Sequence, residues 1–399
     1  MRLLLVAMSE SIHTARWIAQ IADQGWDVHL FPCVDYGVIH PEIRNVTVYH
    51  SFYDREETNK SVKFKGCQLY YKALAILAKQ ILNKFFFQYR VVQLQRLIKK
   101  LKPDIIHSLE FQHSAYLTLK AKKNFRKSFP SWIVTNWGSD IYLFGRLKKH
   151  KPKIQAVLKE SDYYSCECSR DVDLAKAYGF TGKVLPVFPN TGGFDQRTIS
   201  SLKQLSKVSN RRLIMLKGYQ SWAGRALTGL RALERCADIL TGYRVAIYSA
   251  NTEDINIAAE LFHDSTGVPV KIIPKNTPHD EILRFHGQAR ISIGLSISDS
   301  VSTSFLEAIV MGSFPIQSWT SCANEWIDDG RTGILVHPED PEAVEAAIRL
   351  ALSDDALVNQ AAEENSQTCR ERLDYDFLKS KTIELYLTVA QENNIQNVT

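Results

Sequence analysis

The sequence lacks the long apolar runs that mark a membrane-spanning chain. Hydrophobic residues make up 45% of its 399 positions, yet no stretch of about 18 uncharged apolar residues occurs. The apolar start, residues 1–7, is followed at once by Ser9, Glu10 and His13, without a small-residue cleavage site. We therefore predict a first β-strand here, rather than a signal peptide, in a globular cytoplasmic protein.

Cysteine is sparse and has no framework. The seven cysteines are scattered and odd in number, which is typical of reduced thiols. Cys166 and Cys168 have no second pair at zinc spacing, so we interpret them as alternating residues of one strand. No metal site is predicted from cysteine.

The chain also lacks the dinucleotide fingerprint, a solenoid repeat and any low-complexity tract. Its first strand is followed by Met8-Ser-Glu-Ser-Ile-His13 instead of Gly-x-Gly-x-x-Gly, which argues against NAD. No redox cofactor is expected.

What the sequence does contain is a rhythm of short apolar runs and helical patterns. The length suits two domains, and the rhythm predicts α/β structure with two doubly wound, Rossmann-like domains. Predicted strands occupy 1–7, 28–31, 104–107, 132–135 and 163–166, and then 213–216, 244–248, 270–273, 291–295 and 334–336. The expected domains are 1–195 and 196–375, since Pro189 and the paired glycines near 192 interrupt both patterns. A last helix over 376–399 is expected to pack back toward the first domain.

Charge is divided unevenly along the chain. Residues 1–195 contain 29 basic and 17 acidic residues, a net of +12, while the remainder contains 20 basic and 26 acidic residues, a net of −6. The basic half includes an aromatic-rich helical stretch, residues 68–102. Its lysines either cover a helix face or meet an anionic membrane surface. The first half is thus expected to contact something anionic.

Residues 291–315 form the most informative segment. A predicted strand ends in a loop of small residues, and a helix follows it. Ser302, Thr303 and Ser304 at the helix start present backbone N–H groups that suit a phosphate. Asp299 in the loop and Glu307 in the helix are expected to face a ligand at the carboxyl end of the sheet.

A second loop predicts a diphosphate site. The strand 213–216 runs into Lys217 and Gly218, and Arg225 precedes the next predicted helix. Two cations beside a helix N-terminus can neutralise a diphosphate. The alternative interpretation is that Lys217 and Arg225 are ordinary surface residues.

These residues resemble the retaining glycosyltransferases of family 4, which have the GT-B fold. The family signature Glu-x7-Glu, then Ala-x-x-x-Gly-x-Pro, is matched here by Asp299, Glu307, Ala308, Gly312 and Pro315. The segment from Glu325 to Pro338 resembles the family's Glu-x4-Gly-x-x-Gly-x-Leu-x-x-Pro pattern.

The resemblance implies transfer of a sugar from a UDP- or GDP-sugar with retention, without a metal. It implies that Glu307 holds the ribose, that Asp299 contacts the donor sugar, and that Glu325 belongs to the nucleotide-sugar site. Lys217 and Arg225 would supply the diphosphate charges from displaced positions, because Tyr219 and Ala223 stand where the family has Arg and Lys.

The acceptor side is predicted in the first domain. Residues 135–140 resemble the family's His-Gly-Ser-Asp segment, with Trp137 in place of the histidine, and Asp140 either binds an acceptor hydroxyl or caps a helix. Further candidates for acceptor binding are Ser11, His13, Glu110 and His113.

An aspartate pair provides the one candidate for a metal. Asp171 and Asp173 are separated by one residue, but we interpret them as acids of a first helical turn.

The expected partners are a nucleotide sugar and a glycan or lipid-linked acceptor, with no nucleic acid. The expected role is polysaccharide synthesis, with peripheral association at the inner face of the membrane. A nucleotide-sugar epimerase on the same fold remains an alternative. A non-catalytic module that binds sugar nucleotides or polyanions is another, because Asp299, Trp137 and Tyr219 depart from the family pattern.

Overall fold

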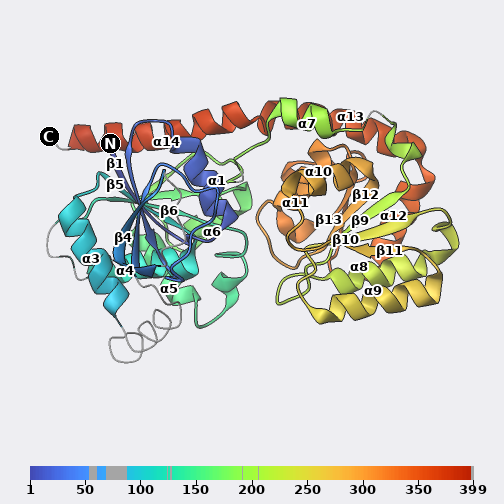
Figure 1. Ribbon diagram of the computed structural model, residues 1–399, viewed down its shortest axis with the longest axis horizontal. Coiled ribbons are helices and arrows are strands. Elements are labelled where there is room, and N and C mark those ends of the chain that lie inside the picture. Colours follow the sequence, from blue (N-terminus) through green and yellow to red (C-terminus); the bar gives the residue numbers. More distant parts are fainter. Residues whose placement is uncertain are drawn as a thin grey trace. The chain divides into compact units, whose positions relative to one another are not determined.

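Buried apolar runs form the strands of two parallel sheets, and each sheet belongs to its own structural unit. The computed structural model describes residues 1–53, 61–68, 88–123, 125, 128–190, 192–204 and 206–396, with side chains through residue 393. Unit 1 comprises residues 1–193 and 376–399, and unit 2 comprises residues 194–375 (Figure 1). Each unit is described by itself below.

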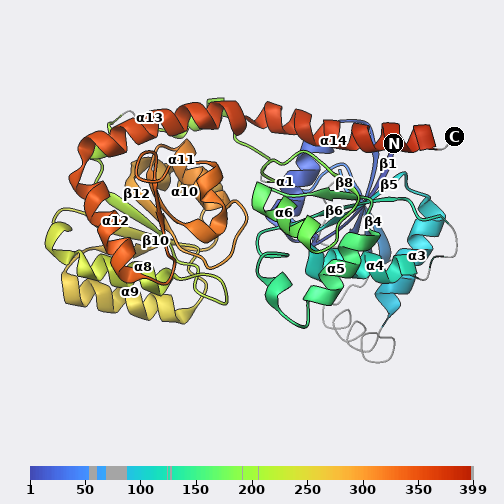
Figure 2. The same ribbon diagram turned by 180° about the vertical axis from the view of Figure 1, so that it is seen from behind.

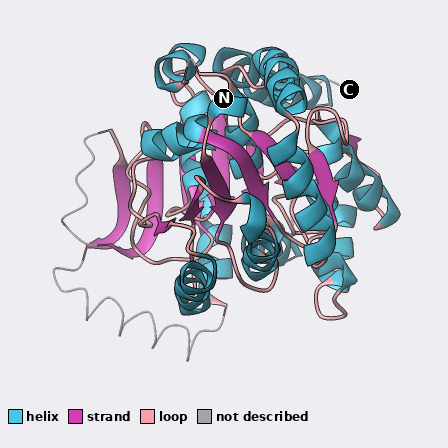
Figure 3. Cartoon of the chain, turned by 90° about the vertical axis from the view of Figure 1, so that its right-hand side faces the viewer, coloured by secondary structure: helices cyan, strands magenta, loops and turns pink. Residues whose placement is uncertain are grey.

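The sheet of unit 1 is parallel throughout, in the order β4-β3-β2-β1-β5-β6-β7-β8. Its strands are β1 (Arg2–Ala7), β2 (Asp27–Pro32), β3 (Thr47–Tyr53), β4 (Lys63–Gln68), β5 (Ile105–Leu109), β6 (Ser131–Thr135), β7 (Tyr163–Ser165) and β8 (Lys183–Val184). The central strands are buried along nearly their whole length, as is typical of a sheet covered on both faces. Figure 3 shows the strands flanked by helices.

Alternate residues of these strands face different helices. Leu4 and Ile106 belong to a core shared with α3 (Tyr89–Leu101), α4 (Tyr116–Lys123) and α5 (Lys151–Glu160). The opposite face carries α1 (Ile12–Ile21) and the long last helix α14 (Tyr375–Gln396). A further helix, α6 (Ser169–Ala177), follows β7.

Helix α14 joins unit 1 through buried polar contacts. The hydroxyl oxygen of Tyr386 accepts a hydrogen bond from Trp17 Nε1 at 2.8 Å and lies 2.7 Å from His107 Nδ1. The Thr382 hydroxyl donates to Gln20 Oε1 at 2.6 Å. Figures 1 and 2 both show α14 alongside α1. Residues separated by over 350 positions are thereby fixed in one layer.

The sheet of unit 2 is also parallel, in the order β11-β10-β9-β12-β13-β14. Its strands are β9 (Leu213–Lys217), β10 (Arg244–Tyr248), β11 (Val270–Ile272), β12 (Ala289–Gly294), β13 (Phe314–Ser318) and β14 (Ile334–Val336). Its helices are α7 (Gln196–Leu202), α8 (Ala226–Arg235), α9 (Glu253–Thr266), α10 (His279–Gln288), α11 (Thr303–Val310), α12 (Pro341–Ser353) and α13 (Asp355–Arg372).

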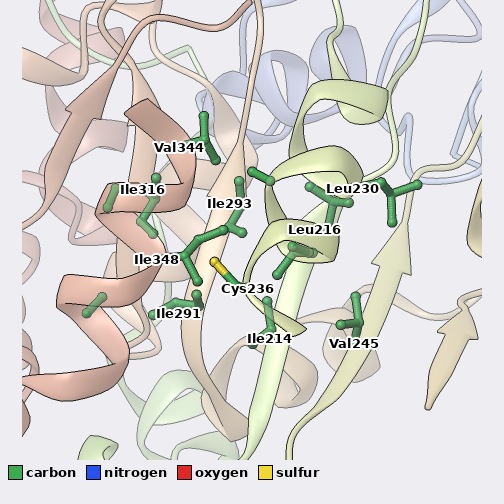
Figure 4. Close-up of a cluster of buried hydrophobic side chains, with 14 of the residues drawn as sticks. Ile214, Leu216, Leu230, Cys236, Val245, Ile291, Ile293, Ile316, Val344 and Ile348 are labelled. Atoms are coloured by element: carbon green, nitrogen blue, oxygen red, sulfur yellow. The ribbon is translucent and has the colours of Figure 1, made fainter. Parts of the chain in front are cut away.

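The core of unit 2 lies between the sheet and helices α8 and α12. Figure 4 shows Ile214, Leu216 and Ile293 from the strands packed among Leu230 of α8 and Ile348 of α12. Helix α12 starts sharply, because the carboxylate of its N-cap residue accepts two backbone N–H groups and a proline follows at its first position. A second layer, α10, covers the other face of β9 and β10.

The predicted strands are confirmed, and one detail of the prediction is wrong. Cys166 and Cys168 lie just beyond β7, not within it, and both are buried. Pro315 lies inside β13, one residue before the point at which β14 begins to pair with this strand. Strands β3, β4 and β8 were not predicted from the sequence. Of the aromatic-rich stretch 68–102, residues 69–87 lie outside the described residues.

No described helix combines the length and hydropathy needed to cross a membrane.

The buried tyrosine of α14 supports a first prediction. Burial lowers the pKa of His107 to about 3, so this imidazole is neutral and offers one donor and one acceptor. Tyr386→Phe removes the partner of the Trp17 indole and is expected to lower the free energy of unfolding by about 1–3 kcal/mol. Tyr36→Phe, at a tyrosine that is 64% exposed, is the control. Urea denaturation of both variants checks this, and equal stability would contradict it.

Candidate active site

The candidate donor site lies where the strand order of unit 2 reverses. Strands β9 and β12 are neighbours in the sheet, although the chain leaves them for opposite edges. Their carboxyl ends open the crevice in which doubly wound folds bind ligands. Lys217 ends β9, and its Nζ donates a hydrogen bond to the Ser302 hydroxyl at 3.0 Å. This contact brings two predicted site residues together.

Ser302 is the N-cap residue of α11, but its hydroxyl does not cap the helix. The hydroxyl instead accepts from Lys217 and lies 2.9 Å from the Ser304 hydroxyl. The first backbone N–H groups of the helix are therefore not capped by this side chain and can receive an anion. Thr303 is the first residue of α11 and is half-buried.

Glu307 lies in the second turn of the same helix and is only 6% exposed. His279, the first residue of α10, places its Nε2 2.7 Å from Glu307 Oε1. A nearly buried carboxylate requires such partners. His279 was not predicted as a site residue, because nothing in the spacing of residues 279 and 307 shows that the two helices lie side by side.

Asp299 lies in the loop between β12 and α11, as predicted. Its Oδ1 accepts the backbone N–H of Ser300 at 3.0 Å, and the residue is half-buried. The acid is thus oriented by its own loop, close in sequence to the α11 N-terminus.

Two features of the loop after β9 were not predicted from the sequence. Arg225 is the N-cap residue of α8, but its Nε pairs with Glu339 Oε1 at 2.8 Å. Gly218 has a packing reason for lacking a side chain, because a Cβ there would lie 2.6 Å from Ile247 Cγ2. Among the described residues, Lys217 has no carboxylate partner, whereas Arg225 is paired with Glu339.

Glu325 ends a short 3₁₀ helix, Ala323–Glu325, after β13. Its backbone carbonyl accepts a hydrogen bond from the Arg372 side chain at 2.8 Å. The residue is half-buried.

In unit 1 the predicted acceptor residues follow β1, β5 and β6, which are adjacent strands. Glu110 directly follows β5 and has φ 83°, a conformation that non-glycine residues seldom adopt. Its carboxylate caps the π-helix Phe111–Ala115 by accepting from the backbone N–H groups of His113 and Ser114. The hydrogen bond that the His113 ring donates to the Glu110 carboxylate raises the pKa of His113, whose ring is exposed. Strain of this kind is found at functional sites.

Asp140 is buried between the β5 and β6 loops. Its Oδ2 accepts from Trp137 N at 2.8 Å and from Phe111 N at 3.0 Å. Burial, and then the charge of Glu110, raise the pKa of Asp140 well above its usual value. The residue is 6% exposed. Its two hydrogen bonds hold the loops after β5 and β6 together, which is a structural role.

Ser11 and His13 begin the helix after β1. The Ser11 hydroxyl caps α1 by accepting from His13 N at 3.2 Å. The His13 ring lies 5.5 Å from the Trp137 ring, so the loops after β1 and β6 meet.

Asp171 lies in the first turn of α6, as predicted, whereas Asp173 is the fifth residue of this helix and lies beyond that turn. Asp171 is fully buried and accepts hydrogen bonds from Asn136 Nδ2 at 2.7 Å and from Arg170 Nε at 2.9 Å. These contacts give Asp171 a structural role in joining α6 to the β6 loop.

The comparisons with known proteins agree with this architecture. The sequence matches the family Glycosyl transferase 4-like over residues 2–167 and the family Glycosyl transferases group 1 over residues 267–368. Among curated proteins, none matches significantly. The chain belongs to the group 1 glycosyltransferases with the GT-B fold.

Solved structures resemble nearly the whole chain. Sucrose-phosphate synthase from Thermosynechococcus elongatus is 12% identical with a TM-score of 0.68, covering 98% of this chain and 99% of that one. A glycosyltransferase from Rickettsia africae is 16% identical with a TM-score of 0.68, covering 97% and 98%. The Escherichia coli structure described as trehalose-6-phosphate bound with UDP-2-fluoro glucose is 12% identical with a TM-score of 0.69, covering 98% and 99%. At these identities the likeness establishes the fold.

The buried Asp140 carboxylate supports a second prediction. Asp140→Asn keeps an oxygen for both backbone N–H groups but removes the ionisable group, so its stability at neutral pH is expected to equal or exceed that of the wild type. Asp140→Ala is expected to lose about 1–3 kcal/mol.

The effect of pH has a definite sign. Because the folded-state pKa is raised, deprotonation favours the unfolded chain, so the wild type loses stability as pH rises above the ordinary aspartate value toward the raised one. The advantage of the asparagine variant should therefore grow with pH. Urea denaturation from pH 4 upward measures it, and a constant difference would show that Asp140 is ionised normally.

Proposed function

We propose that this glycosyltransferase moves a sugar from a nucleoside diphosphate sugar to a glycan or lipid-linked acceptor, with retention of the anomeric configuration. The observation that carries this proposal is the diversion of the Ser302 hydroxyl from its helix to Lys217. An ammonium group thereby stands beside uncapped N–H groups at the carboxyl edge of the sheet. This arrangement suits a diphosphate better than a neutral ligand.

Catalysis then consists of stabilising the leaving diphosphate. Lys217 and the α11 N-terminus hold the charge that grows on the leaving group, and preorganised groups of this kind act without a metal. Arg225 joins them when the donor displaces Glu339, which is half-exposed and competes for the guanidinium. Glu307, oriented by His279, holds the ribose hydroxyls, and Asp299 contacts the sugar.

The donor is proposed to carry UDP. Support comes from the E. coli relative bound with UDP-2-fluoro glucose, although that ligand belongs to a protein 12% identical to this one. The acceptor is proposed to bind unit 1, beside His13, Trp137 and His113. The pathway proposed is polysaccharide synthesis in the cytoplasm, at the inner face of the membrane.

Donor binding tests the proposal through Glu307. Glu307→Ala removes charged hydrogen bonds worth about 1.5–3 kcal/mol and is expected to weaken UDP binding by about tenfold or more. Glu281→Ala, at an exposed acid in the first turn of α10, is the matched control. Calorimetry with UDP and transfer assays with UDP-, GDP- and ADP-sugars in EDTA make the measurement. An unchanged dissociation constant in folded Glu307→Ala removes Glu307 from the site, and transfer restored only by Mg²⁺ would contradict metal independence.

A second test concerns the basic layer, by which we mean the exposed lysines of α3, α4, α5 and the turn before α5. Helix α4 packs between α3 and α5. The layer includes Lys99, Lys100, Lys120, Lys123, Lys148, Lys149, Lys151 and Lys153. Each such residue near an anionic membrane can add about 1 kcal/mol of attraction. The layer is proposed to hold unit 1 on the membrane that carries the acceptor.

We expect the protein to sediment with phosphatidylglycerol vesicles at low salt and to be released at high salt. Replacing Lys148, Lys149 and Lys151 by serine should reduce pelleting. Replacing three exposed lysines of unit 2, Lys207, Lys271 and Lys275, should leave it unchanged. Absence of pelleting at low salt would overturn membrane association while leaving the transferase assignment intact.

A further inference from the structure

Unit 2 contains a recess at the edge of its sheet opposite the candidate donor site. The recess has a volume of about 580 Å³, and residues that line it include Asn210, Arg211, Arg212, Tyr243, Arg244 and Gln288. We name it the arginine recess. This volume lies in the range of small-molecule sites.

Its position follows from the strand register. Leu213 and Arg244 are the first residues of β9 and β10 and are paired with each other. Lys217 and Tyr248 are the last residues of the same strands. Four residues of β-strand span roughly 13 Å, so a ligand in the arginine recess lies at the amino edge and leaves the donor site free.

The arginine recess is lined by cations without acids. Its lining contains Arg211, Arg212 and Arg244 but no aspartate or glutamate. Elsewhere in unit 2, six arginines have carboxylate partners: Arg225, Arg231, Arg235, Arg290, Arg331 and Arg349. The sequence after residue 195 has a net charge of −6, so the three arginines are not part of a generally basic surface.

Arg211 is the most unusual of the three. It is 5% exposed, and its NH1 donates to the carbonyl of Ala289 at 3.2 Å. Its Nε is buried without a hydrogen-bond partner in the described structure. Burial lowers the pKa of Arg211 to about 10. A buried guanidinium that no carboxylate neutralises is costly unless an anion compensates it.

The other two arginines are held by neutral groups. Arg212 NH1 donates to the carbonyls of Ser209 and Arg211 at 2.8 and 3.1 Å, and its guanidinium carbon lies 5.2 Å from the Tyr243 ring centroid. Arg244 NH2 donates to Gln288 Oε1 at 3.4 Å. Both side chains are exposed at the rim of the arginine recess. Neither forms an ion pair with a carboxylate among the described residues.

We infer that the arginine recess binds a phosphorylated small molecule of about the size of a sugar phosphate. Arg211, Arg212 and Arg244 all line this recess, and no acid does. The planar guanidinium matches the oxygens of a phosphate in two parallel hydrogen bonds. The phosphate compensates Arg211, and the remaining volume accommodates the body of the ligand beside Tyr243. This site is separate from the donor site, so the two ligands bind together.

Thermal unfolding and calorimetry of the full chain test the inference, with inorganic phosphate and glucose 6-phosphate as probes. UDP is present at saturation to occupy the donor site, and NaCl keeps the ionic strength constant. The wild type should show a saturable rise in Tm with glucose 6-phosphate, and a smaller rise with phosphate. The Lys217→Gln variant should respond like the wild type.

The rim arginines provide the decisive variants, because Arg211 is buried and its loss affects folding. The double variant Arg212→Gln/Arg244→Gln should bind glucose 6-phosphate about tenfold or more weakly. Arg284→Gln, at an exposed arginine of α10 outside the lining, should bind normally. No saturable response in the wild type, an undiminished response in the double variant, or a response lost in Lys217→Gln would each overturn the inference.

Discussion

The hydrogen bond between Lys217 and Ser302 connects the end of β9 to the start of α11, where the strand order of unit 2 reverses. It depends on the register of β9 against β12 and on the position of α11, which packs on β12 and β13. Because the Ser302 hydroxyl accepts a hydrogen bond from Lys217 and does not cap α11, the first backbone N–H groups of this helix remain available to a ligand. The fold thus places a cation and a helix N-terminus at one point, and the proposed chemistry of the leaving diphosphate follows from that placement.

In unit 1, buried polar side chains likewise connect separate elements of the fold. Asp140 joins the loops after β5 and β6, Glu110 caps the π-helix that follows β5, and Tyr386 ties α14 to the sheet. Each of these three side chains has a backbone or side-chain hydrogen-bond partner, as burial requires. These contacts fix the loops beside His13 and Trp137, where the acceptor is proposed to bind. His113 is exposed beside these loops, so its side chain is available to the proposed acceptor.

Much of the fold could be predicted from the sequence, because central parallel strands are continuous apolar runs such as residues 1–7 and 213–216. The missed strands β3 and β4 alternate or are largely exposed at the sheet edge, so no apolar run marks them. Asp299 and Glu307 could be found because they share one strand–loop–helix segment. The pairing of Glu307 with His279, and of Arg225 with Glu339 114 positions away, could not, because such contacts arise only when separate elements pack.

The central claim is that unit 2 binds a nucleoside diphosphate at the carboxyl edge of β9 and β12. The most direct measurement is a crystal structure of the protein with UDP. We expect the diphosphate to lie within hydrogen-bonding distance of Lys217 Nζ and of the first backbone N–H groups of α11. We expect the ribose to lie at Glu307. UDP bound at another place, with Lys217 still donating only to Ser302, would contradict it.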